Sequence, residues 1–116
     1  MTTPPSALSL PRFYLEDPAG KPRPVFDIRT WAHGYHLANN VVAVNQFKLN
    51  PDEDDYRVET IFTGVVADQA QFPPELYSTF VLYGIHLEDQ ISSPTREDAE
   101  ETHNACVRDI QSGRFF

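Results

Sequence analysis

Two histidines three residues apart are the first candidates for chemistry in this chain. His33 and His36 lie in a segment with the apolar spacing of a helix, and residues three apart are neighbours on a helix surface. Two imidazoles at that spacing can bind one metal ion if further ligands, such as His86 or His103, join them. The chain has no CxxC or HExxH motif to complete such a site. A solvated surface pair explains the spacing more simply, so we expect no metal site and no cofactor.

A second candidate is a nucleophile and base around His103. Cys106 follows at i+3, and Ser78 or Thr79 lies on a strand that the same helix could cover. The chain has no GxSxG motif, and no acid is placed to orient the imidazole. A cysteine on an apolar stripe is more often a small core residue, and His103 can pack with one ring nitrogen bonded to a loop carbonyl. We therefore predict no enzymatic activity, and a small His/Cys-dependent enzyme remains the weakest alternative.

Carboxylates form the third group. Residues 52–55 are four consecutive acids in a predicted connection, and the predicted last helix has an acidic face. The run lacks the ligand spacing, the central glycine and the later glutamate of an EF-hand, so a solvated loop is favoured over a calcium site. Loop and helix together could form one acidic surface that imitates the charge of a nucleic-acid backbone. We predict a partner-binding site at Asp52, Glu53, Asp54, Asp55, Glu97, Asp98, Glu100 and Glu101.

The elements that position these groups follow from turn signals and apolar periodicity. Residues 1–10 are rich in proline and serine and are predicted to be a flexible N-terminus. Short strands at 12–16 and 22–26 flank a Pro- and Gly-containing turn, and the prolines of the second strand restrict it to a sheet edge. A helix begins after the N-cap Asp27 and ends near Asn39 and Asn40. Its apolar stripe is Ile28, Trp31, Ala32 and Tyr35.

Three longer strands are predicted at 41–49, 56–66 and 76–87, followed by a loop at 88–94. Strand 76–87 is apolar on both faces, which is typical of a central strand. The last helix starts at a capping-box-like Thr95–Asp98 and ends before Gly113. Its apolar stripe is Ala99, Thr102, His103, Cys106 and Ile110. The order ββαβββα predicts an α+β fold with an antiparallel sheet of four to five strands and two helices over one face, in a single domain spanning residues 11–116.

Charge limits the classes of partner. The 116 residues carry a net charge of -8: residues 1–50 have five basic against three acidic residues (+2), and residues 51–116 have four against fourteen (-10). Such a chain should not bind nucleic acid through phosphate contacts, but it suits a basic protein surface. The single cysteine, Cys106, excludes an intrachain disulfide and is consistent with a reducing, cytoplasmic setting. No apolar run approaches the roughly 20 residues that span a bilayer, and no signal peptide is evident.

Five short pieces follow one another between about Val25 and Ile110: Trp31-Ala32, Val58 to Gly64, Pro73-Pro74, Tyr77 to Leu82, and Thr95 to Ala99 with His103. They correspond to a Trp-containing helix, a V-x-T-x-F-x-G strand, a Pro loop, an F-E-T-M-V-F-like strand and a T-x-E-E-A-x-x-x-H helix. In this order they resemble a small, uncharacterised protein family of actinobacterial phages and prophages. The chain has Ser78 where the family usually has glutamate. The resemblance implies a phage-linked origin in a host cell and no established activity.

These observations favour a non-enzymatic, phage-derived binding protein. Its partner would be a host or phage protein with a basic surface, and one version is an acidic inhibitor of a host defence or nucleic-acid-binding complex. The alternative is a structural or accessory phage protein that self-associates through its sheet or an exposed aromatic surface, which gives a homo-oligomer.

Overall fold

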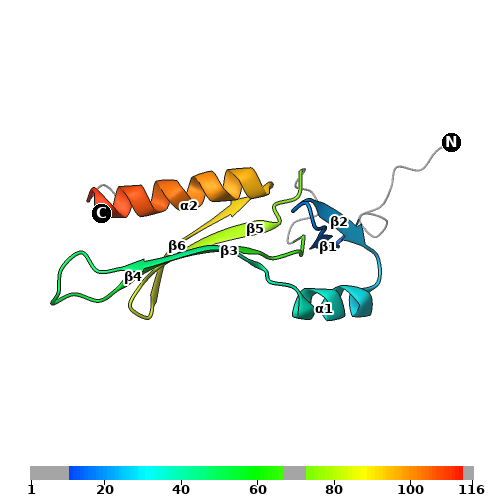
Figure 1. Cartoon of the computed structure of the whole chain (residues 1–116), viewed down its shortest axis with the longest axis horizontal. Coiled ribbons are helices and arrows are strands. Elements are labelled where there is room, and N and C mark those ends of the chain that lie inside the picture. Colours follow the sequence, from blue (N-terminus) through cyan, green and yellow to red (C-terminus); the bar gives the residue numbers. More distant parts are fainter. Residues whose placement is uncertain (1–10, 67–72, 114–116) are drawn as a thin grey trace.

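The computed structural model describes residues 11–66 and 73–113. They form an α+β fold, as predicted from the sequence, with strands in a two-stranded and a four-stranded antiparallel sheet (Figure 1). The predicted flexible segment 1–10 lies outside the described residues. In chain order the elements are β1 (Phe13–Glu16), β2 (Pro22–Val25), α1 (Ile28–Leu37), β3 (Val41–Phe47), β4 (Tyr56–Phe62), β5 (Tyr77–Tyr83), β6 (His86–Ser93) and α2 (Arg96–Gln111).

β1 and β2 form a small hairpin whose turn is organised by Asp17. Its Oδ1 accepts hydrogen bonds from the N–H groups of Ala19 and Lys21, both at 2.9 Å, and its Oδ2 accepts one from Arg23 at 2.9 Å. Gly20 has φ of 80°, in the left-handed region that favours glycine. Among the described strands β2 pairs with β1 alone, so its prolines lie in an edge strand, as predicted.

α1 packs mainly on this hairpin, and its Tyr35 reaches the end of the four-stranded sheet at Phe62. Asp27 is the predicted N-cap, and its side chain accepts from the N–H of Arg29. The ring of Trp31 lies 5.1 Å from that of Phe13, and α1 makes its strand contacts with β1 and β2. The prediction that both helices cover one face of a single sheet is therefore wrong for α1. The narrow hairpin cannot cover the whole apolar stripe, and Ile28 stays 58% exposed.

The hairpin and α1 are joined by hydrogen bonds to the main sheet at the end of β4 and just beyond it. Tyr14 donates its N–H to the carbonyl of Gly64 at 2.8 Å, and the Tyr35 hydroxyl donates to the carbonyl of Phe62 at 2.6 Å. Gly64 has φ of 68°, and a Cβ there would lie 2.6 Å from the carbonyl oxygen of Tyr14. Only glycine permits this approach. The positive φ of Gly64 also departs from extended backbone, so β4 ends at Phe62 and does not reach residue 66 as predicted.

The main sheet has the order β3-β4-β5-β6, and α2 lies across one of its faces (Figure 1). β5 is central, as predicted, because it pairs with both β4 and β6. Thr95 caps α2 by accepting from the N–H of Asp98 at 3.1 Å. The helix buries the predicted stripe positions Ala99, His103, Cys106 and Ile110. Beneath them lie the alternate strand residues Tyr56, Val58, Thr60, Phe62, Tyr77, Thr79 and Val81.

The segment predicted as one strand at 76–87 followed by a loop is instead a hairpin. β5 ends at Tyr83 and β6 begins at His86, so only Gly84 and Ile85 form the turn. Gly84 has φ of 60°, and no described non-glycine residue has positive φ, so Ile85 does not. One positive φ at the first turn position is the pattern of a type II′ hairpin turn. The polar composition of residues 86–93 hid this strand.

The second face of the main sheet carries no helix or strand in the described part of the chain. α2 contacts the strands on the opposite face, and α1 lies on β1 and β2 and reaches the main sheet through Tyr35 at the end of β4. Twelve residues in three rows across the four strands make up this surface, which we call the open face. The rows are Val41, Ile61, Ser78 and Ser92; Val44, Glu59, Phe80 and Gln90; and Gln46, Arg57, Leu82 and Leu87.

Candidate functional site

A chain of hydrogen-bonded side chains lies between α2 and the sheet. His103 Nδ1 lies 2.9 Å from Thr60 Oγ1, which in turn lies 2.7 Å from Thr79 Oγ1. On the other side of the ring, His103 Nε2 lies 2.7 Å from Asn45 Oδ1. Thr60 and Thr79 are fully buried and His103 is 2% exposed. We call this set the threonine–histidine chain.

The chemistry of the acceptors fixes the order of donors. An amide oxygen only accepts, so Nε2–H donates to Asn45 and a neutral His103 accepts at Nδ1 from the Thr60 hydroxyl. The Thr79 hydroxyl then donates to Thr60, and each group between the two ends has a partner. Burial lowers the pKa of His103, which keeps the ring neutral. The expected partner of His103, a loop carbonyl, is wrong: both ring nitrogens bond to side chains on strands.

The arrangement has the order of a nucleophile, a base and an orienting amide, but it is closed to substrate. Thr60 Oγ1 lies beneath the helix with its residue fully buried, so an acyl carbon cannot reach it. The proposed alternative nucleophiles are not assembled. Ser78 lies on the open face, away from His103, and burial raises the pKa of the Cys106 thiol, which disfavours the reactive thiolate. The geometry favours a structural role for the threonine–histidine chain.

The histidine pair on α1 is exposed. His33 and His36 lie on the solvent side of the helix, and His86 is an exposed residue at the start of β6. His103 is occupied at both ring nitrogens beneath α2. Within residues 11–66 and 73–113, no group of three His, Cys, Asp or Glu side chains is arranged to hold a metal ion.

The acidic loop lies at the end of the β3–β4 hairpin. Asp52, Glu53 and Asp54 are exposed. Asp55 is anchored, because its carbonyl accepts from the N–H of Gly84 at 2.9 Å. A Cβ on Gly84 would lie 3.0 Å from Asp54 Oδ2, so the β5–β6 turn packs against the loop. We call residues 52–55 together with this turn, residues 84–85, the acidic tip.

The acidic residues of α2 lie far from that tip. Glu97, Asp98, Glu100 and Glu101 occupy its first turns, next to the hairpin of β1 and β2. The β3–β4 connection lies at the other end of the main sheet, near the end of α2 (Figure 1). The length of the sheet, roughly 24 Å for seven-residue strands, separates the two groups. The structure therefore places the eight predicted contact residues in two groups and not side by side.

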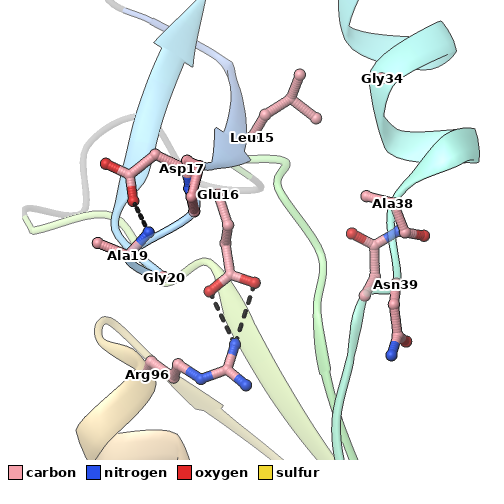
Figure 2. Close-up of a pocket in the computed structure, with 11 residues that line it drawn as sticks. Leu15, Glu16, Asp17, Ala19, Gly20, Gly34, Ala38, Asn39 and Arg96 are labelled. Carbon is pink, nitrogen blue, oxygen red and sulfur yellow. Dashed lines mark hydrogen bonds and ion pairs between the residues drawn. The ribbon is translucent and has the colours of Figure 1, made fainter.

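A cavity of about 430 Å³ lies between the β1–β2 turn, the end of α1 and Arg96 (Figure 2). The Glu16 carboxylate on its wall accepts from the Tyr77 hydroxyl at 2.7 Å and from Arg96 Nη1 at 3.1 and 3.2 Å. Arg96 Nε also donates to Glu100 at 3.3 Å. Burial and the bond to Glu16 raise the pKa of Tyr77. These groups already hold one another, so they act as a clamp that joins β1, β5 and α2.

Sequence reasoning missed this clamp, and it found the threonine–histidine chain only in part. Glu16, Tyr77 and Arg96 are separated by up to 80 positions, and no local pattern connects them. The residue type of Thr60 could have indicated its role. A threonine on the helix-facing side of an otherwise apolar and aromatic strand needs a hydrogen-bond partner when it is buried. A histidine on the buried stripe of the covering helix is the natural candidate.

Comparison of the chain with protein-family models, curated proteins and solved structures found no match. In the described part of the chain, neither helix has the length and hydropathy needed to cross a membrane.

Proposed function

We propose that the protein is a non-enzymatic binding protein that engages a basic protein surface through its acidic tip. The observation that carries this proposal is the concentration of exposed carboxylates at the end of a projecting hairpin. Asp52, Glu53 and Asp54 are exposed there, and Lys48 is the only cation in the described residues within ion-pairing distance of the tip, 3.9 Å from Asp55. A dense group of carboxylates with one weakly paired cation attracts positive charge.

An apolar residue accompanies these carboxylates. Ile85, in the turn that packs on the loop, is 93% exposed, the highest value among the exposed large hydrophobic residues described. Interfaces commonly combine an apolar anchor with a polar rim, and the anchor supplies affinity while the charges supply on-rate and selectivity. The tip offers both within two adjoining turns, which a purely solubilising acidic loop does not need.

The class of partner follows from the charge of the chain and from its resemblance to the phage family. Nucleic acid is disfavoured because phosphates would meet carboxylates. A phage-linked origin supports a host or phage protein whose basic surface normally contacts nucleic acid, including one in a defence complex. In that role the protein would act as an acidic inhibitor that occupies the basic surface.

The test is charge reversal at the tip. The triple variant Asp52→Lys, Glu53→Lys and Asp54→Lys should lose capture of the partner when the immobilised protein is incubated with host-cell lysate and eluted with salt. The eluted protein is identified, purified and titrated at several salt concentrations. We expect affinity to fall at least about tenfold and the dependence of log K on log salt to flatten, because fewer ion pairs form.

A matched control moves the same charge change to the other end of the molecule. Glu97→Lys, Asp98→Lys and Glu101→Lys also change the net charge by +6 and should leave binding within about twofold. Circular dichroism must show that both variants are folded, because acids in a first helical turn stabilise it by about 0.3–1 kcal/mol each. Equal capture by the tip variant and the wild type would overturn the proposal. Loss of binding only in the α2 variant would move the contact to that helix.

A further inference from the structure

The open face combines exposed apolar side chains with almost no charge. Val44 is 41% exposed and Leu87 is 54% exposed, one on each edge strand, and the half-buried Phe80 and Leu82 lie between them on β5. A sheet in a globular domain normally covers one face and leaves the other polar. Here the open face, which no described helix or strand covers, has an apolar centre, which is typical of an interaction surface; in its outermost row Ser78 is only 6% exposed.

The charge of the open face indicates which kind of partner it can bind. Arg57 and Glu59 are its only charged residues, and Arg57 Nε lies 3.3 Å from Glu59 Oε2. The face is therefore neutral on a chain with net charge -8. Two copies repel each other overall because each carries a net negative charge, but this face lets them meet without bringing like charges together. In a two-fold arrangement the same patch contacts itself, so Arg57 of each copy can face Glu59 of the other.

The edges of the sheet are protected, which favours contact through the face over contact through an edge. β3 has a bulge between Val41 and Ala43, and β6 has one beside Leu87. Bulges on edge strands twist the edge away and interrupt the ladder that a further strand would extend. β6 also carries Glu88 and Asp89 at its bulge, which oppose pairing with a second acidic chain.

The size of the face is sufficient for a modest dimer. Four strands of seven or eight residues, about 4.8 Å apart with about 3.4 Å per residue, span a flat area of roughly 450 Å² per copy. Side-chain relief adds to this, so the total for two copies reaches the roughly 1,000–1,200 Å² at the lower end of specific interfaces. Sheets packed face to face lie about 10 Å apart, so these side chains would interdigitate.

We propose that the open face binds a second copy of this chain, which gives a two-fold dimer with the two sheets packed face to face and α2 on each outer side. The acidic tips lie at the ends of the sheets and stay accessible, so one dimer presents two of them. The dimer does not depend on what the tip binds.

The test is the mass of the protein in solution, by sedimentation equilibrium and light scattering between about 1 and 500 µM. The wild type should show a monomer–dimer equilibrium in the range expected of small interfaces. Val44→Glu with Leu87→Glu places four new carboxylates in the dimer contact and should weaken it at least about a hundredfold. Both positions are exposed, so folding should be retained.

Two controls make the result specific to this face. Leu49→Glu with Ile85→Glu adds the same charge at exposed positions near the acidic tip and should leave dimerisation unchanged. Arg57→Glu and Glu59→Arg should each weaken the dimer at least about tenfold, because each gives the face a net charge that is repelled by its copy. The double exchange Arg57→Glu/Glu59→Arg restores neutrality and should restore the dimer.

A wild type that stays monomeric at about 500 µM overturns the dimer proposal. A dimer that persists in the Val44/Leu87 variant uses an edge or the tip, and it also overturns the proposal. Failure of the tip to bind a basic partner leaves these masses unchanged, so the two proposals succeed or fail separately.

Discussion

Replacing Thr60 with valine should destabilise the protein far more than the loss of one oxygen atom suggests. Thr60 is fully buried, and its Oγ1 lies between Thr79 Oγ1 at 2.7 Å and His103 Nδ1 at 2.9 Å. Valine keeps the shape and the β-branching but leaves both neighbours without this partner. A buried polar group left unsatisfied costs about 1–3 kcal/mol, so the expected loss is roughly 2–5 kcal/mol.

Two matched substitutions give the expected order. Thr79→Val removes the end of the threonine–histidine chain while Thr60 keeps its bond to His103, so the cost should be about 1 kcal/mol. Thr102→Val makes the same chemical change at a half-buried position of α2, with no side-chain hydrogen bond to a described residue, and should stay within about 0.5 kcal/mol. The order of the three stability losses tests the threonine–histidine chain more sharply than any one loss.

Urea unfolding at pH 7.5 measures these differences through far-UV circular dichroism and the fluorescence of Trp31, the single tryptophan. A shift of the midpoint with an unchanged slope reports stability alone. Because Trp31 lies on α1, coincidence of the two probes also tests whether the two sheets unfold together. The reasoning is refuted if Thr60→Val costs no more than Thr79→Val, or if its cost is below about 0.5 kcal/mol.

Three further outcomes are expected. Burial lowers the folded-state pKa of His103 below its ordinary value of 6.5, so the stability that neutral His103 contributes is complete above that pH and is lost as the pH falls toward the folded-state pKa. Urea midpoints measured between pH 7.5 and 5 should therefore drop more steeply for the wild type than for His103→Gln. Gly64→Ala should reduce stability by more than about 2 kcal/mol and Gly113→Ala by only about 1 kcal/mol. Both glycines have positive φ, but a Cβ at Gly64 would also lie 2.6 Å from a backbone oxygen, whereas a Cβ at Gly113 meets nothing; equal shifts of the thermal unfolding temperature would contradict this. Glu16→Gln weakens the clamp with Tyr77 and Arg96 and should cost about 1–2 kcal/mol at pH 7, whereas Glu97→Gln at an exposed position should cost less than 1; a Glu16 effect no larger than that control would count against the clamp.

The last helix is the part of the fold that follows most directly from the sequence. The Thr95 cap, the buried stripe and Gly113 agree with one another, and the structure has α2 within one or two residues of the predicted bounds. β4 and β5 follow for the same reason, because alternating large apolar residues, aromatics and threonines indicate strands with one face against a helix.

β6 could not be predicted in the same way. Residues 86–93 are mostly polar and exposed, and they form a strand because β5 offers its second edge to them across the Gly84–Ile85 turn. The packing of α1 was equally hidden, since an apolar stripe indicates that a helix is covered but not by which sheet. The open face results from both: α1 lies mainly on the hairpin of β1 and β2, and β6 adds a fourth strand to the main sheet.

The sequence by itself determined the chemistry available to the protein: an acidic second half, one buried-type cysteine, no metal motif and a histidine on an apolar helix face. Only the tertiary structure decided where those groups act. His103 is enclosed between Thr60 and Asn45, and the acids of α2 lie a sheet length from residues 52–55. One face of the main sheet carries no helix or strand from the described residues. The physical reason is that residue types and local periodicity set what each segment buries, whereas partners across the fold depend on strand pairing between segments distant in the chain.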